Sequence, residues 1–410
     1  MPEISFDNLV IVVAVAFVCP LLLGVFPALR IPSVVLEVVA GIVLGPSVLG
    51  WVHIDDAVQV LSLIGVAFLL LLAGIEIDYD QLRGRQLEVA LLGFALSFGI
   101  ALALGFGLNS AGVFSAPFLI AVILSATSLA VVLPVLKDSN LIESRFGQLV
   151  IAGTSIADVA TIVMLSLFFS MDSGGLGSRL LLFGAFGLLG LAAAGTIFVG
   201  EHLARVSAAL MKLQDTTAQI RVRGAFLLLI AFSIFALQFG LEAILGTFIA
   251  GAILKLADRD RMMTHTHFHR KLEEAGFGIF IPVFFVASGI RFDGHALFAS
   301  GSALAKVPLF FILLLVIRGL PAIVYRPLVG TRLTAAAGFL QATNLSFVIV
   351  ASTIGVQLGL LSGATAAALV AAAVLSVVVY PLIALTLLRG MGESAREAAA
   401  AGAAEPAPTG

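Results

Sequence analysis

Long apolar segments, separated by short polar stretches, follow one another along almost the whole chain. Each is long enough for an α-helix to cross a bilayer, which takes ~20 residues. The pattern therefore predicts an all-α polytopic membrane protein with about 13 transmembrane helices. The expected spans are residues 9–28, 33–50, 57–75, 87–108, 115–136, 147–170, 178–200, 218–236, 240–256, 274–292, 304–325, 333–357 and 364–388.

The composition indicates the same class of protein. Hydrophobic residues make up 60% of the chain and charged residues 11%, whereas soluble proteins carry roughly 25% charged residues. The net charge of -2 gives no reason to expect a nucleic acid partner. The sequence contains no GxxxxGK[ST] pattern and no second aspartate inside a predicted span. ATP-driven transport, intramembrane aspartyl proteolysis and enzyme activity in general are therefore not expected, and neither is a cofactor.

The lysines and arginines predict the orientation, because they concentrate in loops on the inner side of a membrane. With the N-terminus placed outside, 18 of them fall in inner loops and the tail and 3 in outer loops. We therefore expect a multi-pass protein of the cell (plasma) membrane with its C-terminus in the cytoplasm.

An odd number of helices is typical of two six-helix repeats joined by a linker helix. Residues 73–78 (AGIEID) resemble residues 288–293 (SGIRFD), at the ends of two spans that point in opposite directions. This is the pattern of an inverted repeat, which is common among secondary transporters. The expected organisation is a transmembrane domain over 1–390, with repeats at about 9–170 and 218–388, a linker helix at 178–200, and a disordered cytoplasmic tail at 391–410.

One carboxylate, Asp158, is the single charge in the apolar stretch Gly147–Ser170, and it lies near its middle. A charge at the bilayer centre costs ~3 kcal/mol or more, and such residues usually mark an ion or proton path. Thr154 lies one turn earlier on the same helix face, and Ser155 follows it, so both hydroxyls are candidate cation ligands. The alternative reading of Asp158 is a structural salt bridge with Arg318.

Two further spans are locally polar at mid-depth although they carry no charge there. They contain Ser125–Ser128 (SATS) and Gln341–Ser346 (QATNLS). Helices broken at the midplane expose carbonyls and helix ends that can hold a cation. We therefore predict discontinuous crossing helices, with Thr127, Ser128 and Asn344 as candidate cation or proton ligands. The alternative is that these side chains only bond back to their own helices.

Arg318 is the only basic residue well inside a predicted span. Because arginine keeps its proton in proteins, it cannot release one in each transport cycle. We expect it to give electrostatic support, close to a carboxylate or to the negative end of a broken helix.

Three histidines, His265, His267 and His269, alternate in a predicted cytoplasmic loop (THTHFHR). On an extended segment their imidazoles could share one side and bind a metal or sense pH. A solvated loop without either role is the more common case, so no metal site is predicted.

Several short segments have a recognisable pattern. They are residues 31–37 (IPSVVLE) followed by 41–47 (GIVLGPS), and residues 126–128 (ATS), 133–137 (LPVLK), 240–246 (GLEAILG) and 280–286 (FIPVFFV). Taken together, these segments resemble the monovalent cation:proton antiporter family, in the branch of bacterial sodium/proton antiporters and glutathione-gated potassium-efflux systems. The first two resemble the second helix of that family and the others resemble later helices, and the resemblance extends over about residues 9–388.

The resemblance implies that Asp158, in the sixth helix, is the shared site for cation and proton. Electrogenic members carry an acidic pair there and a lysine in the eleventh helix. This chain has Ala157 before Asp158 and Arg318 near the lysine's place, which is similar to electroneutral exchangers. In the twelfth helix residues 343–345 (TNL) replace the Gly-Glu-Phe of many relatives, so the cation preference is not carried over.

We therefore expect a secondary antiporter that exchanges a monovalent cation (Na⁺ or K⁺) for H⁺ electroneutrally, by competition at Asp158 with alternating access. Relatives suggest a homodimer in the lipid bilayer. The alternative is a channel-like or sensory membrane protein on the same scaffold, because Ala157 and Asn344 differ from the family pattern. A channel would dissipate a cation gradient without moving protons.

Overall fold

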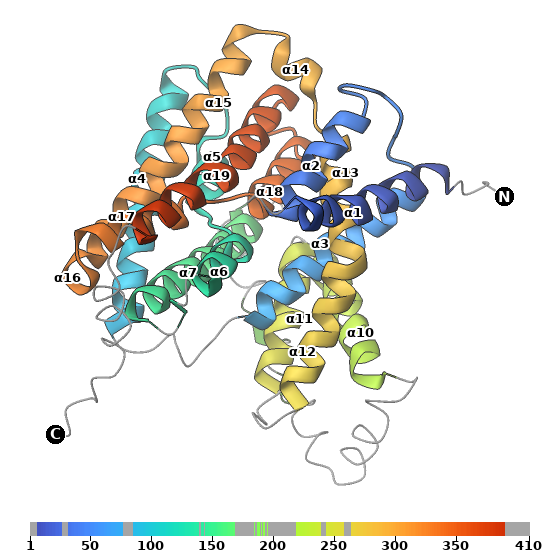
Figure 1. The fold of residues 1–410 in the computed structure, drawn as a ribbon, viewed down its shortest axis with the longest axis horizontal. Coiled ribbons are helices and arrows are strands. Elements are labelled where there is room, and N and C mark those ends of the chain that lie inside the picture. Colours follow the sequence, from blue (N-terminus) through green and yellow to red (C-terminus); the bar gives the residue numbers. More distant parts are fainter. Residues whose placement is uncertain are drawn as a thin grey trace. The chain divides into compact units, whose positions relative to one another are not determined.

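The computed structural model describes residues 6–26, 32–76, 85–138, 141–142, 144–168, 219–238, 243–257 and 264–389, with single positions between 184 and 195. All regular structure in these residues is helical, as the apolar pattern predicts, and the described part contains no strand (Figure 1). The chain divides into two compact units, here called unit 1 and unit 2.

Unit 1 comprises residues 1–18, 51–77 and 162–290. Its helices are the first part of α1 (Asp7–Val25), α3 (Asp56–Glu76), α10 (Ile220–Gln238), α11 (Ala243–Ala257), α12 (Thr264–Ala275), η1 (Gly276–Phe280) and α13 (Ile281–Ile290). The long helix α3 packs against both α11 and α13, and α10 packs on α11.

Glycines let these helices approach each other at backbone distance. A Cβ added to Gly74 of α3 would come within 2.9 Å of the Ala252 nitrogen, and one added to Gly251 of α11 would lie 3.0 Å from the Gly74 Cα. A Cβ at Gly65 would likewise lie 3.0 Å from the Phe280 carbonyl carbon. Small residues commonly allow such packing between membrane helices, so unit 1 depends on the absence of side chains at these positions.

Unit 2 comprises residues 19–50, 78–161 and 291–410. Its helices are α2 (Ser33–Leu44), α4 (Arg85–Ser110), α5 (Pro117–Ser125), α6 (Leu129–Asp138), most of α7 (Arg145–Phe168), α14 (Gly294–Phe298), α15 (Gly301–Leu314), η2 (Leu315–Gly319), η3 (Leu320–Tyr325), α16 (Arg326–Val329), α17 (Thr331–Gln341), α18 (Ser346–Gln357) and α19 (Gly363–Arg389). α15 and α17 both pack on α19. One buried apolar cluster joins α6, α7, η3, α17 and α19.

Within the described residues, 9 helices are long and apolar enough to cross a membrane. Two shorter apolar helices and the broken pair α5–α6 correspond to further predicted spans. The predicted linker helix at 178–200, apart from single positions, and the predicted tail at 391–410 lie outside the described residues. Every other predicted span has a helical counterpart, while the inverted repeat stays a prediction.

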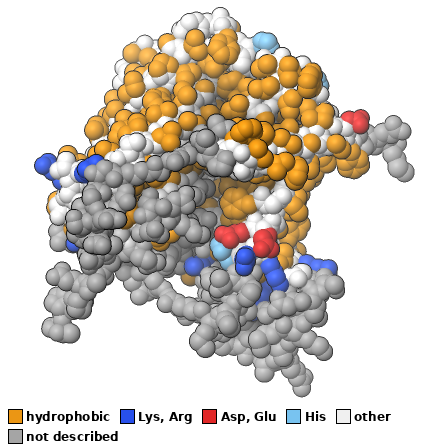
Figure 2. All heavy atoms as spheres, in the orientation of Figure 1, with side chains coloured by type: hydrophobic (Ala, Val, Ile, Leu, Met, Phe, Trp, Pro, Cys, Tyr) orange, Lys and Arg blue, Asp and Glu red, His pale blue; other side chains and the backbone are white. Residues whose placement is uncertain are grey.

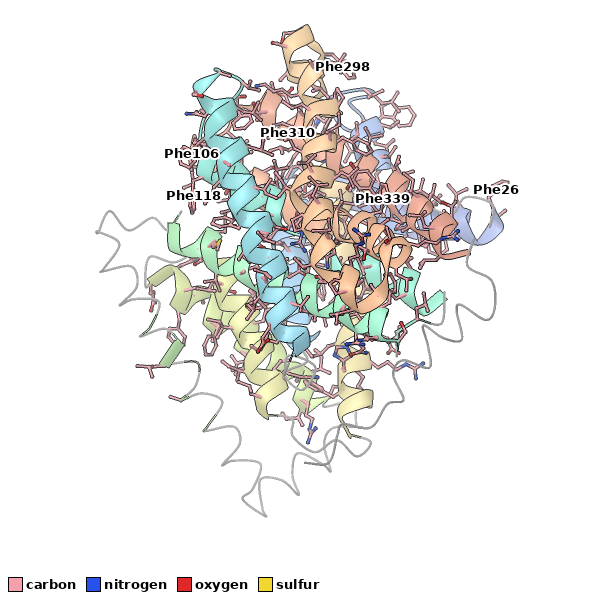
Figure 3. The ribbon with its side chains drawn as sticks, turned by 90° about the vertical axis from the view of Figure 1, so that its left-hand side faces the viewer. Phe26, Phe106, Phe118, Phe298, Phe310 and Phe339 are labelled. Carbon is pink, nitrogen blue, oxygen red and sulfur yellow. The ribbon has the colours of Figure 1, made fainter. Side chains whose placement is uncertain are left out.

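The surface agrees with helices that face lipid. Hydrophobic side chains cover most of the described surface on the face that Figure 2 shows. In Figure 3, Phe106 and Phe298 of unit 2 stand clear of their helices, with 54% and 73% of their surface exposed, whereas Phe310 is fully buried. Large exposed apolar side chains of this kind are typical of a surface that lipid or another protein covers.

Two membrane helices contain a π-helical turn, and each turn lies just before a proline. η1 precedes Pro282, and η2 precedes Pro321. Proline cannot donate to the carbonyl four residues earlier, and its ring clashes with that carbonyl, so the regular hydrogen-bond ladder is interrupted. π-turns occur frequently at functional sites, and η2 carries Arg318.

The segment with three histidines was predicted to be a loop, and this prediction is wrong, because Thr264–Ala275 form the helix α12. His269 Nε2 lies 3.1 Å from Glu273 Oε1, one turn away, and such a pair supports a helix. The side chains of His265 and His267 lie outside the described residues. Among the described side chains, no group of at least three His, Cys, Asp or Glu residues could hold a metal ion.

Candidate functional site

Two helices of unit 2 are interrupted at the places that the polar segments predict. One break separates α5 from α6, and the other separates α17 from α18. At each break a hydroxyl bonds back to the carbonyl three residues earlier. Ser125 Oγ donates to the Val122 carbonyl at 3.0 Å, and Thr343 Oγ1 donates to the Leu340 carbonyl at 2.6 Å. These bonds provide donors for carbonyls at the ends of the helices, where the backbone ladder stops.

The two breaks are also bonded to each other. Thr127 Oγ1 in the first break donates to the Gln341 carbonyl at 2.9 Å, and the Ser128 backbone N–H donates to the Thr343 carbonyl at 2.9 Å. Thr127 and Ser128 are buried, with 2% and 4% of their surface exposed. Non-helical backbone is tolerated at membrane depth only where it is satisfied by protein or water, and these bonds meet that condition.

Asn344 completes the crossing of the two broken helices. Its Nδ2 donates to the Ile123 carbonyl, in the last turn of α5, at 2.9 Å, and its backbone N–H donates to Ser376 Oγ of α19 at 3.3 Å. Its Oδ1 is buried and accepts no hydrogen bond from the described residues. The structure thus brings Thr127, Ser128 and Asn344 together, and Asn344 retains an available acceptor oxygen.

Arg318 reaches this crossing from η2 and is almost completely buried. Its Nε donates to Thr127 Oγ1 at 2.7 Å, its Nη1 to Ser97 Oγ of α4 at 3.2 Å, and its Nη2 to the Gly153 carbonyl of α7 at 3.4 Å. The positive charge of Arg318 is therefore held by neutral acceptors from three separate segments of the chain. The C-terminal ends of α5 and α17 carry partial negative charge, and both meet at the break that Arg318 contacts.

Asp158 is half-buried on α7, five residues beyond Gly153, and it interacts electrostatically with Arg318. Thr154, one turn earlier, is fully buried, and its hydroxyl donates to the Val150 carbonyl of its own helix at 2.8 Å. The Thr154 hydroxyl therefore donates its proton to its own helix, and the lone pairs of its oxygen can still accept. Ser155 is buried in the same turn.

Sequence reasoning missed three residues of this site. Two weak signals were available for two of them. Ser97 is an isolated hydroxyl in an apolar helix, and Tyr325 is one of 3 tyrosines. Tyr325 Oη accepts a hydrogen bond from Gln341 Nε2 at 2.8 Å. Gly153 contributes a carbonyl oxygen and the absence of a side chain, and neither is visible in a sequence before the helices are placed.

The chain matches the family model described as "Sodium/hydrogen exchanger, transmembrane" over residues 13–390. A putative Na(+)/H(+) antiporter of Bacillus subtilis, YjbQ, is 34% identical over 400 residues, which are 93% of this chain and 63% of that protein. This chain therefore spans less than two thirds of that relative's length. The probable Na(+)/H(+) antiporter 3 of Methanocaldococcus jannaschii is 24% identical over 91% of this chain and 94% of its own. The Na(+)/H(+)-K(+) antiporter GerN of Bacillus cereus is 28% identical over 64% of this chain and 66% of its own.

Among solved structures, the sodium proton antiporter MjNhaP1 of Methanocaldococcus jannaschii, determined at pH 8, has a similar fold. The TM-score is 0.66, and the match covers 94% of this chain and 99% of that structure at 18% sequence identity. At this identity the similarity concerns the fold alone.

Proposed function

Because the chain belongs to the sodium/hydrogen exchanger family, we propose that it is a secondary antiporter that exchanges a monovalent cation, Na⁺ or K⁺, for protons. Relatives over nearly its whole length are named as Na(+)/H(+) antiporters, and the name of GerN adds potassium. The observation that carries the proposal is the crossing of two broken helices, which are bonded to each other and to Arg318, together with the electrostatic interaction between Arg318 and Asp158. Such crossings hold substrate and coupling ions in secondary transporters.

In this mechanism Asp158 is the shared binding site. Its carboxylate holds either a proton or the cation, and alternation between inward-open and outward-open states moves whichever is bound. Because both ions need the same group, competition at Asp158 couples the two fluxes without a further device.

Neutral oxygens complete the cation's coordination. Asn344 Oδ1 supports this role because it is buried at the crossing and accepts no hydrogen bond from the described residues. The hydroxyls of Thr127, Ser128, Thr154 and Ser155 are the other candidate ligands. A cation at a site like this replaces its water shell with carbonyl and hydroxyl oxygens of the protein.

The charges at the site support one-for-one, electroneutral exchange. Arg318 keeps its charge and interacts electrostatically with Asp158, so the pair is neutral when the carboxylate is ionised. One bound proton or one bound monovalent cation then adds the same single charge. Both halves of the cycle carry equal charge across the membrane, and no net charge moves.

The test is proton movement in inside-out membrane vesicles with a ΔpH-sensitive dye, to which Na⁺, K⁺ or Li⁺ is added in turn. We expect cation-triggered dequenching in the wild type and none in Asp158→Asn. The control Asp56→Asn, in the exposed first turn of α3, removes a carboxylate that is not among the proposed ligands and should respond like the wild type. Exchange by Asp158→Asn at the wild-type rate would refute the mechanism. Cation flux without proton movement in the wild type would favour the channel alternative.

On the family resemblance we also propose a homodimer, with the N-terminus outside and the C-terminus in the cytoplasm. Cross-linking in native membranes tests the dimer. Tags at the two ends, probed with a membrane-impermeant reagent on intact cells, test the orientation.

A further inference from the structure

Gly153 of α7 is covered by the polar ends of two side chains. A Cβ built at Gly153 would overlap the Tyr325 hydroxyl and lie 2.5 Å from Gln341 Nε2. These two groups are hydrogen-bonded to each other at 2.8 Å, and both residues are at most 2% exposed. The Tyr325–Gln341 pair therefore rests on α7 at a point where only a hydrogen atom fits.

Gln341 connects this contact to the helix breaks. It is the last residue of α17, and its carbonyl accepts a hydrogen bond from Thr127 Oγ1 in the other break at 2.9 Å. Gly153 in turn offers its carbonyl to Arg318 Nη2 at 3.4 Å. Two contacts thus meet at Gly153 of α7. The Tyr325–Gln341 pair packs where a side chain would be, and Arg318 bonds to the backbone carbonyl.

We propose that Tyr325 and Gln341 are positioning residues for cation exchange. Through their contact with Gly153 they fix the position of α7 relative to the two helix breaks. This inference rests on the proposed function. Asp158 lies five residues beyond Gly153, or ~7.5 Å along a helix, so a shift of α7 at Gly153 also shifts the carboxylate. A misplacement of ~1 Å at a reacting group can reduce a rate by ~100-fold.

The kind of contact at Gly153 makes the proposal testable, because it differs from the glycine contacts of unit 1. A methyl group at Gly74 or Gly251 would meet the backbone of a neighbouring helix, which would have to move as a whole. At Gly153 the obstructing atoms belong to the ends of two side chains and not to the backbone of a neighbouring helix. Gly153→Ala should therefore displace the Tyr325–Gln341 pair while the helices remain packed.

The experiment compares Gly153→Ala, Tyr325→Phe and the double variant by the dye assay, over a range of Na⁺, K⁺ and Li⁺ concentrations. The matched control is Gly99→Ala on α4, where nothing lies within 4 Å of the added Cβ. We expect Gly153→Ala and Tyr325→Phe each to raise the apparent KM for the cation at least fivefold and to change the preference among the three ions. In the double variant the overlapping hydroxyl is gone, so its apparent KM should lie below that of Gly153→Ala.

The amount of folded protein, measured by size-exclusion chromatography, normalises the maximal rates. Wild-type KM values and ion preference in both single variants would overturn the positioning role. A fall in maximal rate that only follows the amount of folded protein would also overturn it, because it would mean a merely structural contact. A wild type without cation-dependent proton movement would instead refute the proposed function, so the two failures are distinguishable.

Discussion

The hydroxyl of Thr127 bonds to both Arg318 and the second helix break, which makes it a sensitive point of the crossing. It accepts from Arg318 Nε at 2.7 Å and donates to the Gln341 carbonyl at 2.9 Å. Thr127→Val keeps the branched shape of the side chain and removes both bonds. The loss therefore reports on the hydrogen bonds of the crossing and leaves its packing nearly unchanged.

The expected magnitude follows from these two bonds. A hydrogen bond to a charged group contributes ~1.5–3 kcal/mol and a neutral one ~1 kcal/mol, so the loss is about 2.5–4 kcal/mol. If binding of the cation requires the intact crossing, the apparent affinity falls by a factor between ~60 and ~700, because ~1.4 kcal/mol corresponds to a factor of ten.

The matched control is Thr353→Val on α18. Thr353 Oγ1 donates to the Ile349 carbonyl of its own helix at 2.9 Å, and loss of such a bond is worth ~1 kcal/mol or less. Both variants are purified in detergent, their intact fractions are followed on heating, and their apparent cation affinities are measured in vesicles. Thr127→Val should melt earlier than Thr353→Val and bind the cation more weakly. Equal melting and equal affinity would refute the reasoning that Thr127 links the breaks to Arg318.

Two further predictions concern the fixed charge and the packing of unit 1. Arg318→Lys keeps the positive charge but loses the planar set of donors, so exchange in the dye assay should fall at least tenfold, and a fully active lysine variant would show that the charge alone suffices. Gly74→Ala would meet the carbonyl of Phe248, so size-exclusion chromatography should show little monodisperse protein, and a wild-type yield would contradict the backbone contact.

Much of the fold could be predicted from the sequence because the bilayer fixes the length of a spanning helix. Both helix breaks could also be located, since hydroxyls and amides in the middle of an apolar span compete with the backbone for hydrogen bonds. The π-turn that contains Arg318 was not predicted, although Pro321, two residues after the end of this turn, was a usable signal. The α12 helix was missed because its support comes from pairs such as His269–Glu273, which matter only once the segment is helical.

The candidate site could be predicted only in part. Asp158 and Arg318 were identifiable because an isolated charge in an apolar span is conspicuous. Ser97 and Tyr325 were not identifiable, because their roles depend on which helices lie beside η2. Gly153 was hidden for the same reason, since its contribution is the space that it leaves for two side chains from a distant part of the chain.

The most direct test of the account is cation binding to the purified protein as a function of pH, with the wild type beside Asp158→Asn. If protons and the cation compete for the one carboxylate, the apparent Kd of the wild type should rise as the pH falls, approaching tenfold per pH unit where the proton-bound form dominates. Asp158→Asn should show no such pH-dependent binding. A wild-type Kd that is independent of pH, or the same pH-dependent binding in Asp158→Asn, would contradict competition at Asp158.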